Sequence, residues 1–385
     1  MDILIHYILP FLGMLIALIV IHEAGHYFTA KLFGIKVLEA GLGYPPRAIG
    51  REWRGTIYSI NWLPLGGFVR LLGEEDPTDP QSLAAQAAWK RIIVLGSGAF
   101  MNFVLVIVLF TLVFLLPRTV PKGPAVIDVV EVNSPASVAQ LYDGEKLLDE
   151  RGLHQGDVIL KVDGHNIENT QDAGRYIRID QGKLLTFDIQ RNDTGGGTLL
   201  LQAKVQSRWD PPDGQGPTGI QIKDRVTGSA ICQGTSPPDQ CYNREHFGLF
   251  TSIHKGWTST IESLQLARNQ VIAMFKGGSG PSLAGPVGIA QATGEVVKED
   301  GWVTLLQLAA LLSLNLGIIN ILPLPMLDGG RIFFVLIEIA RRGKRIAPEK
   351  EAIVHLVGLA LIITMAVVVT YVDVARLISG KSLFS

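Results

Sequence analysis

The sequence predicts an α-helical membrane protein with four transmembrane helices and a water-soluble α/β insert. Three observations lead to this fold class: four long apolar runs, a low charge content, and a strand-rich segment between the second and third runs. Of the 385 residues, 48% are hydrophobic and 18% are charged, whereas soluble domains carry about 25% charged residues. The mean hydropathy of +0.30 is typical of chains in which several long apolar runs accompany an ordinary soluble part.

The composition also excludes several classes of protein. The apolar content is too high for a disordered chain, and two cysteines cannot support a disulfide scaffold. The 34 basic and 35 acidic residues give a net charge of −1, so a surface for nucleic acid is not expected. The lipid bilayer is the expected environment.

Four charge-free apolar runs predict the transmembrane helices. The first run, 3–21, lies in a helix predicted over 1–33, and the others cover 92–117, 301–327 and 352–372. Each run comes close to or exceeds the roughly 20 apolar residues that cross a bilayer core about 30 Å thick. The first run has no basic segment before it and no small-x-small cleavage site, so we expect a retained span rather than a signal peptide.

Lysine and arginine gather in two loops, and this sets the predicted orientation. Loops 34–91 and 328–351 hold most of the basic residues that lie close to the apolar runs. The positive-inside rule therefore places both loops on the cytoplasmic side. Four spans then put both chain ends, the insert 118–300 and the tail 373–385 on the extracytoplasmic side.

The insert has two predicted parts. Residues 118–206 contain four short runs rich in Val, Ile and Leu around one helix-like segment, which predicts a compact α/β module. Residues 207–300 predict a linker followed by an amphipathic helix over 248–275, which would lie on the membrane surface or bundle, or pack against the module. Cys232 and Cys241 in the linker lack a zinc-knuckle spacing, and they would form one local disulfide or remain two thiols.

The inner end of the first span carries the motif His-Glu-Ala-Gly-His over residues 22–26. Because positions i and i+4 share one face of a helix, His22 and His26 can bind one metal ion. Glu23 beside them is a candidate general base for a metal-bound water. The alternative is that both histidines merely cap the helix end, but ionisable groups at membrane depth are costly unless they line a site.

A third metal ligand is expected at the inner end of the third span. Catalytic zinc takes three protein ligands and a water, and Asp328 is the only acidic residue next to that end. Pro323 and Pro325 break the helix just before it. Asp328 could instead cap the helix that follows. Asn320, one or two turns upstream, could hold the substrate backbone or a developing oxyanion.

These motifs resemble the site-2 protease family of intramembrane zinc metalloproteases. Three segments carry this resemblance: HEAGH, which includes Gly25, the NxxPxPxLDGG segment that ends the third span, and a GLHQGDVILKVDG run over 152–164 that is similar to the signature of PDZ domains. More narrowly, the chain resembles the RseP/RasP-type (regulator of sigma-E protease) in a version with one PDZ domain. The resemblance implies that Zn²⁺ is bound by His22, His26 and Asp328, that Glu23 activates water, and that Asn320 contacts the substrate or the oxyanion.

The resemblance also implies a location and partners. The protein would be a multi-pass protein of the bacterial plasma (inner) membrane, with its active site near the cytoplasmic face. The PDZ domain, 118–206, would be extracytoplasmic, and its groove would bind a peptide or protein ligand, or the domain would act as a size filter above the site.

The resemblance also implies a role for residues 56–72. They form two extended runs around Gly66 and Gly67 and are too apolar for an ordinary cytoplasmic loop. The family places a membrane-re-entrant β-hairpin here, whose edge takes up an unwound substrate as an added strand. Such unwinding makes physical sense, because a peptide bond inside a helix is shielded from attack.

The second span contains a run, Gly96 to Phe103, that resembles the family's GPxxNF pattern and includes Asn102. It predicts close approach between helices beside the site. Ala99 stands where the family usually has proline, so the pattern gives no basis for a proline kink here. Ala284 similarly stands where the family has serine in a Ser-Gly-Pro segment, so a role for that hydroxyl is not assumed.

The function expected from these residues is zinc-dependent cleavage of single-span membrane proteins, such as anti-sigma factors or remnant signal peptides, by metal-activated water. The main alternative is a PDZ-bearing membrane adaptor whose metal site is structural or inactive. A third interpretation is a zinc protease with a glutamate as third ligand, for which Glu338 is the only candidate near the later spans.

Overall fold

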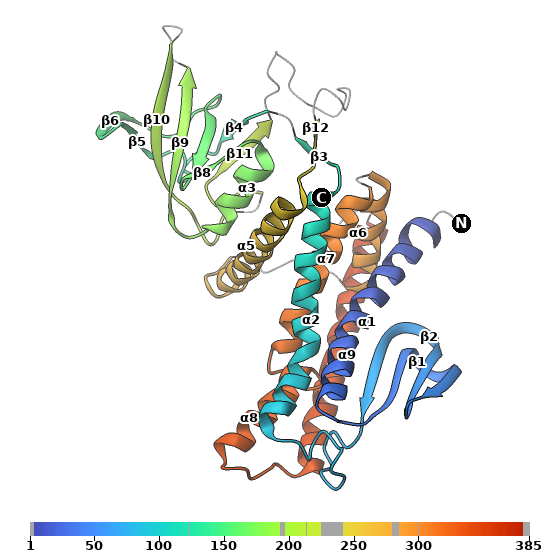
Figure 1. Ribbon diagram of the computed structural model, residues 1–385. Coiled ribbons are helices and arrows are strands. Elements are labelled where there is room, and N and C mark those ends of the chain that lie inside the picture. The colour runs from blue at the N-terminus through green and yellow to red at the C-terminus, as the bar shows by residue number, and fades with distance from the viewer. Residues whose placement is uncertain are drawn as a thin grey trace. The chain divides into compact units, whose positions relative to one another are not determined.

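The chain forms two compact units (Figure 1). The helical unit comprises Met1–Leu115, Gly248–Thr260 and Leu283–Ser385, and the sheet unit comprises Leu116–Phe247 and Ile261–Ser282. The computed structural model describes residues 4–121, 123–192, 197–212, 214–224, 242–278, 285–299 and 301–379.

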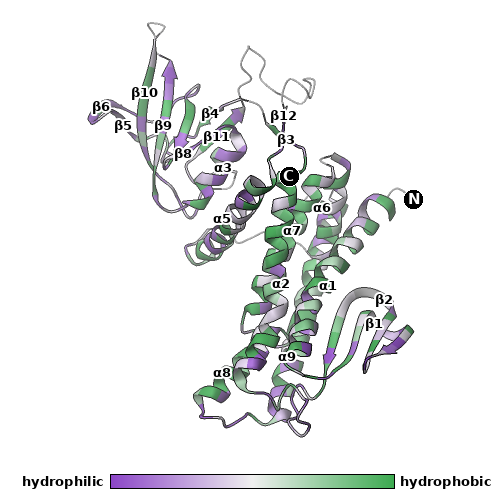
Figure 2. Ribbon diagram, in the orientation of Figure 1, coloured by the Kyte–Doolittle hydropathy of each residue, from purple (hydrophilic) through white to green (hydrophobic). Residues whose placement is uncertain are grey.

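Four helices of the helical unit are long and apolar enough to cross a membrane, which confirms the predicted class of membrane protein. The first span consists of a π-helical turn η1 (Leu4–Ile8) and α1 (Leu9–Leu32), and the others are α2 (Ala88–Leu115), α7 (Trp302–Ile321) and α9 (Pro348–Ile378). Hydrophobic residues cover most of their length (Figure 2). On α9, Leu361 and Val367 are 63% and 64% exposed, as expected for a helix surrounded by lipid.

Prolines end the third span earlier than the apolar run suggests. Helix α7 stops at Ile321, and Leu322 has extended backbone angles (φ −62°, ψ 144°), the conformation that the following Pro323 favours. Pro325 lacks the amide hydrogen that would help to resume a helix. Helix α8 (Asp328–Ala340) begins after this short turn, so the predicted cytoplasmic loop starts with a helix.

Helix α2 packs against α1, α7 and α8. A Cβ atom built on Gly25 of α1 would lie 2.7 Å from the carbonyl carbon of Ser97 on α2, closer than real Cβ atoms come. At the crossing with α7, the hydroxyl of Ser313 donates to the backbone carbonyl of Asn102 (3.0 Å). Small residues at such crossings let two backbones approach closely. Close helix packing beside Asn102 is therefore present, although Ala99 replaces the family's proline.

A two-stranded antiparallel β-sheet follows α1. Strand β1 (Val37–Trp53) pairs with β2 (Thr56–Leu71), and only Arg54 and Gly55 connect them. Both connecting residues have positive φ angles, 48° and 72°. Two-residue turns of this kind match the right-handed twist of the strands they join.

The sequence-based prediction of a hairpin over 56–72 with its turn at Gly66 and Gly67 is wrong. That range is the single strand β2, and both glycines lie inside it. The hairpin instead begins at β1. Prolines are uncommon inside strands, so the internal prolines of β1 make this strand look like a loop in the sequence. Leu42 of β1 is in register with both Gly67 and Ile60, so β2 flanks this part of β1 on both sides.

The β1–β2 sheet lies against α1 (Figure 1). The hydroxyls of Tyr27 on α1 and Tyr58 on β2 are hydrogen-bonded at 2.6 Å. One turn further along α1, the ammonium of Lys31 donates to the hydroxyl of Thr56 (2.8 Å). These two bonds fix the sheet to one face of the first span.

The sheet unit contains an eight-stranded sheet with the order β11-β4-β7-β9-β10-β5-β6, and β8 pairs with β7. Its strands are β4 (Ala125–Val130), β5 (Gln140–Asp143), β6 (Lys146–Arg151), β7 (Val158–Val162), β8 (His165–Asn166), β9 (Leu184–Asn192), β10 (Thr198–Gln206) and β11 (Ile220–Asp224). The predicted module 118–206 is therefore one strand short, because β11 returns to pair with β4.

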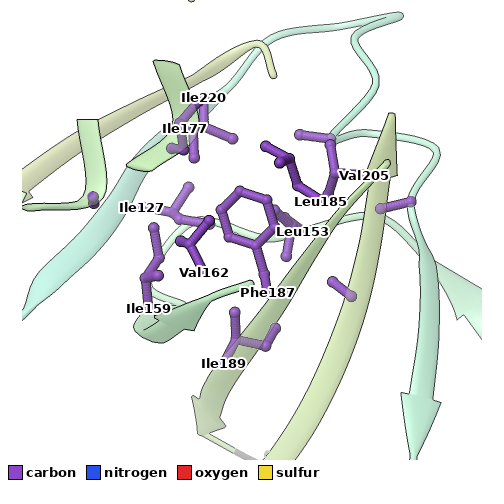
Figure 3. Packing of buried hydrophobic residues seen from close by; sticks show 14 of the residues in the cluster. Ile127, Leu153, Ile159, Val162, Ile177, Leu185, Phe187, Ile189, Val205 and Ile220 are labelled. Atoms are coloured by element: carbon purple, nitrogen blue, oxygen red, sulfur yellow. The ribbon is translucent and has the colours of Figure 1, made fainter. Parts of the chain in front are cut away.

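The core of the sheet unit is built by alternation along its strands. Leu185, Phe187 and Ile189 of β9 are fully buried, whereas the residues between them are only partly so. They pack with Ile127 of β4 and Ile159 of β7 (Figure 3). Helix α3 (Thr170–Ile179) closes one side of this core and begins at Asn169, whose side chain accepts from the backbone N–H of Asp172.

The remaining described elements are one strand at the start of the predicted module and three elements in the predicted linker region. Strand β12 (Tyr242–Glu245) pairs with β3 (Arg118–Pro121), and two helices follow, α5 (Leu249–Phe275) and α6 (Pro286–Glu299). Within the helical unit, Gly256 of α5 lies beside Thr111 of α2. Within the sheet unit, the Asn269 amide of α5 donates to the backbone carbonyl of Ile179 at the end of α3. Cys232 and Cys241 lie outside the described residues.

Candidate metal centre

The two histidines of the HEAGH motif lie on one buried face of α1. His22 and His26 are 7% and 8% exposed, and their Nε2 atoms are 3.3 Å apart. The i, i+4 spacing on a regular helix is sufficient to produce this pair. The sequence-based placement of both side chains on one face therefore agrees with the structure.

Asp328 joins the pair from a different helix. Its Oδ2 atom lies 3.1 Å from Nε2 of His22 and 3.2 Å from Nε2 of His26. As the first residue of α8, it follows the proline turn that ends α7. The residue before it, Leu327, makes no side-chain cap to α8. The Asp328 carboxylate instead points to the histidines, while its negative charge still suits a helix N-terminus.

The three ligand atoms form a triangle that fits a tetrahedral metal ion. Its edges are 3.1, 3.2 and 3.3 Å. Nitrogen and oxygen ligands about 2.0–2.2 Å from a tetrahedral zinc ion lie roughly 3.3–3.5 Å apart. Within the described ranges, this is the only group of three such side chains close enough to hold a metal ion. A zinc ion held by these three side chains would keep its fourth position open, as in catalytic zinc sites.

Each histidine has a hydrogen-bond partner on its other nitrogen. Nδ1–H of His26 donates to the backbone carbonyl of Val94 on α2 (2.8 Å). Nδ1 of His22 lies 3.0 Å from the side-chain amide of Asn102. A metal ion on Nε2 requires the proton on Nδ1, so the amide oxygen of Asn102 is then the acceptor. The Val94 carbonyl thus sets the ring orientation and the tautomer that metal binding at Nε2 of His26 needs. On His22 the facing atom is the amide nitrogen of Asn102, so metal binding there requires this amide to turn its oxygen towards Nδ1.

Glu23 stands next to the ligands but is not one of them. It is partly buried on α1, and its carboxylate accepts a hydrogen bond from the backbone N–H of Val69 on β2. A Cβ atom built on Gly67 would lie 3.8 Å from Cγ of Glu23. The predicted base is therefore flanked by β2, with Gly67 beside it. Gly66, which has φ 88°, makes no described contact with the ligands.

Gly98 is a site residue that the sequence analysis missed. A Cβ atom built on it would lie 2.6 Å from Nε2 of His22 and closer still to Nε2 of His26. The position therefore has no room for a side chain. Within the Gly96–Phe103 run, Gly98 takes the position of the glycine in GPxxNF, but this pattern does not show that the two histidine rings lie next to it.

No described hydrogen bond joins Asn320 to the three candidate ligands. Asn320 is 9% exposed near the end of α7, and its amide donates to the backbone carbonyl of Leu316 (2.9 Å). Pro323 and Pro325 belong to the turn that positions Asp328, and Pro325 also packs on Gly358 of α9. Their supporting role is thus geometric.

Ion pairs hold α8 against neighbouring elements. Glu338 of α8 pairs with Arg91 of α2 (2.7 Å) and with Arg345 (3.2 Å), and Arg331 pairs with Glu74. Burial alone raises the pKa of Glu338, but the hydrogen bond and charge of Arg91 bring the net pKa below its usual value. Glu338 is therefore an ion-pair partner and does not join the metal-binding group, which contradicts the interpretation with a glutamate ligand.

Gly98→Ala is expected to abolish metal binding, because the added methyl group occupies the space of the two Nε2 atoms. Gly96→Ala is the matched control, since its methyl group would meet only the end of the Ile332 side chain at 3.9 Å. The measurement is bound zinc per chain by mass spectrometry, with circular dichroism to confirm equal helix content. Full zinc occupancy in Gly98→Ala would contradict the assigned site.

Asn102→Leu should weaken zinc binding without removing a ligand. Outer partners of metal-bound histidines are worth about 10–100-fold in affinity, and His22 would lose the partner of Nδ1. Competition with a chromophoric chelator measures the affinity. Phe100→Leu, at a 64% exposed position of the same helix, should leave it unchanged, and equal affinities for both variants would argue against the role of Asn102.

Comparison with known proteins identifies the family. The model of peptidase family M50 matches residues 10–365. A candidate zinc metalloprotease of Clostridium perfringens is 34% identical, and the alignment covers 93% of this chain and 95% of that protein. Another from Agrobacterium fabrum is 28% identical over 97% of this chain and 96% of its own length.

A further relative is the zinc metalloprotease RasP of Oceanobacillus iheyensis, which is 27% identical over 96% of this chain and 99% of its own length. These matches cover almost the entire chain and both of its units. Together with four helices long enough to span a membrane and one group of three potential metal ligands in the described ranges, they lead to one conclusion. The chain belongs to peptidase family M50, the site-2 proteases, and is a membrane zinc metalloprotease.

Proposed function

We propose that His22, His26 and Asp328 hold the catalytic zinc ion and that the protein cleaves peptide bonds of single-span membrane proteins. The observation that carries this proposal is the triangle of ligand atoms, with edges of 3.1 to 3.3 Å, built from helices far apart in the sequence. Its open fourth position suits a reacting water or carbonyl. A structural zinc site would instead use four protein ligands.

Glu23 is the proposed general base. When bound at the ligands, zinc supplies Lewis acidity, which polarises the scissile carbonyl and lowers the pKa of water. Glu23 takes the proton of the attacking water and passes it to the leaving amine. The N–H of Val69 and the close backbone of Gly67 hold its carboxylate beside β2. Asn320 would contribute its amide to the substrate after releasing the carbonyl of Leu316.

The proposed substrates are single-span proteins such as anti-sigma factors and remnant signal peptides. Their peptide bonds must leave the helical conformation before attack, because helical backbone groups are already paired. The edges of the β1–β2 sheet offer unpaired backbone groups to such an unwound segment. The hairpin is accordingly proposed to enter the membrane from the cytoplasmic side.

The proposed location is the bacterial plasma membrane, with both chain ends and the sheet unit outside and the metal centre near the cytoplasmic face. The basic residues of loops 34–91 and 328–351 support this orientation. The sheet unit is proposed to be a PDZ-type domain that filters substrates by size. Strand β11 at the end of its sheet would also suit a peptide or protein ligand added as a further strand.

Glu23→Gln should retain zinc and lose cleavage of a single-span substrate by about 10²–10⁴-fold, because the amide cannot accept the proton of water. Asp328→Asn should lose both zinc and cleavage. Glu52→Gln, at an exposed position on β1, is the control and should change neither. Cleavage is followed in detergent by gel, and zinc by mass spectrometry. Two results together would favour a membrane adaptor over a protease: zinc that stays bound in Asp328→Asn, and a parent protein that does not cleave the substrate.

The orientation can be tested by cysteine labelling in a variant where Cys232 and Cys241 are serine. Lys344→Cys, which follows α8, should react with a membrane-impermeant maleimide only after the cells are permeabilised. Leu200→Cys, at a 66% exposed position in the sheet unit, should react in intact spheroplasts. The reverse pattern of labelling would overturn the proposed topology.

A further inference from the structure

An apolar cavity of about 530 Å³ lies between α1 and the β1–β2 sheet. Its helix wall consists of residues three and four apart on one face of α1: Val20, Glu23, Ala24, Tyr27 and Phe28. Its sheet wall includes the stretches 40–42, 58–60 and 67–69, which the register of β1 and β2 brings side by side. The cavity thus has one wall from the first span and one from the hairpin.

The two walls are fixed to each other. The hydrogen bond between the hydroxyls of Tyr27 and Tyr58 (2.6 Å) joins them within the lining itself. The bond from Lys31 to Thr56 (2.8 Å) holds the same helix and strand together just beyond it. The volume falls within the roughly 300–1,000 Å³ typical of ligand pockets. The cavity therefore lies between a helix and a sheet that hydrogen bonds hold together.

The cavity extends directly to the proposed base. Glu23 is one of its lining residues, and its carboxylate accepts from the N–H of Val69, which also lines the cavity. Most of the other lining side chains are apolar, and Arg51 is the only basic residue among them. A chain whose peptide bond reaches Glu23 would therefore place a neighbouring side chain in apolar surroundings.

We infer that this cavity is the subsite for a substrate side chain next to the scissile bond, and that its volume selects bulky aliphatic or aromatic residues at that position. The inference rests on the proposed function, because Glu23 must act on the bond that this side chain adjoins. An extended substrate fits the requirement, since its successive side chains point to opposite sides. One of them then enters the cavity while the adjoining peptide bond faces the base. Hydrophobic burial supplies the preference.

Filling the cavity tests the inference. Ala24→Phe adds an aromatic ring to the helix wall, and Ala17→Phe places the same ring at an exposed position of α1 outside the lining. The scissile bond of a single-span substrate is mapped with the parent enzyme, and the residue on each side of it is changed to Ala, Val, Leu, Phe or Trp. The measurement is kcat/KM for each substrate.

One of the two substrate positions is expected to occupy the cavity. At that position, the Ala24→Phe enzyme should have kcat/KM values for substrates with Leu or Phe that fall at least tenfold relative to the value for the substrate with Ala. The reason is that hydrophobic pockets discriminate between side chains by about 10–200-fold. Ala17→Phe should preserve the ranking of the parent enzyme. Phe68→Ala removes a ring from the sheet wall and so enlarges the cavity. This enzyme variant should prefer substrates with Trp at that position. An equal loss for all substrates in Ala24→Phe, or an unchanged ranking in both lining variants, would overturn the inference.

Photocrosslinking gives a test that does not need turnover. p-Benzoyl-phenylalanine in place of Ile60, a lining residue that is 55% exposed, is combined with Glu23→Gln and the substrate. A crosslink that maps next to the scissile bond is expected, and the same probe in place of Trp53, outside the lining, should give none there. Crosslinks only to phospholipid would identify an acyl chain as the occupant and refute the subsite. If the parent enzyme cleaves no substrate at all, the proposed function itself fails.

Discussion

The metal centre depends on the close approach of α1 and α2. A Cβ atom on Gly25 of α1 would meet the backbone of Ser97 on α2, and a Cβ atom on Gly98 of α2 would meet the rings of both histidines. This approach brings the Val94 carbonyl of α2 within hydrogen-bond distance of His26, and the Asn102 amide of α2 within hydrogen-bond distance of His22. Without it the rings would lack partners for Nδ1, and buried polar groups without partners are costly in an apolar environment. The same approach leaves both Nε2 atoms facing Asp328.

The Asp328 carboxylate reaches both histidines because α8 is restrained at both ends. At its start, the proline turn sets where the carboxylate emerges from the end of α7. Towards its other end, Glu338 pairs with Arg91 of α2, the helix that also supports the histidines. A single ion pair at a surface contributes little to stability. The Arg91 and Glu338 side chains are only 12% and 14% exposed, so this pair is shielded from water and links α8 to α2.

Sequence patterns correctly predicted features that depend on the local geometry of one helix. They failed for strand pairings, which depend on contacts between separate segments. The spacing of His22 and His26 and the proline end of α7 follow from local geometry, and the structure agrees with both. The hairpin was misplaced because β1 contains prolines, and its pairing with β2 is a contact between segments that local patterns do not record. Strand β11 was missed for the same reason, since it joins its sheet after a long loop.

The sequence by itself determined the membrane class, the histidine pair, the candidate base and the acidic residue that could complete a zinc site. These follow from hydropathy, helical periodicity and the chemistry of zinc ligands. Only the tertiary structure decided that Gly98 must lack a side chain, that Glu338 serves in an ion pair, and that an apolar cavity extends to Glu23. Each of these depends on distances between segments far apart in the chain, which packing sets and which no local pattern in the sequence contains.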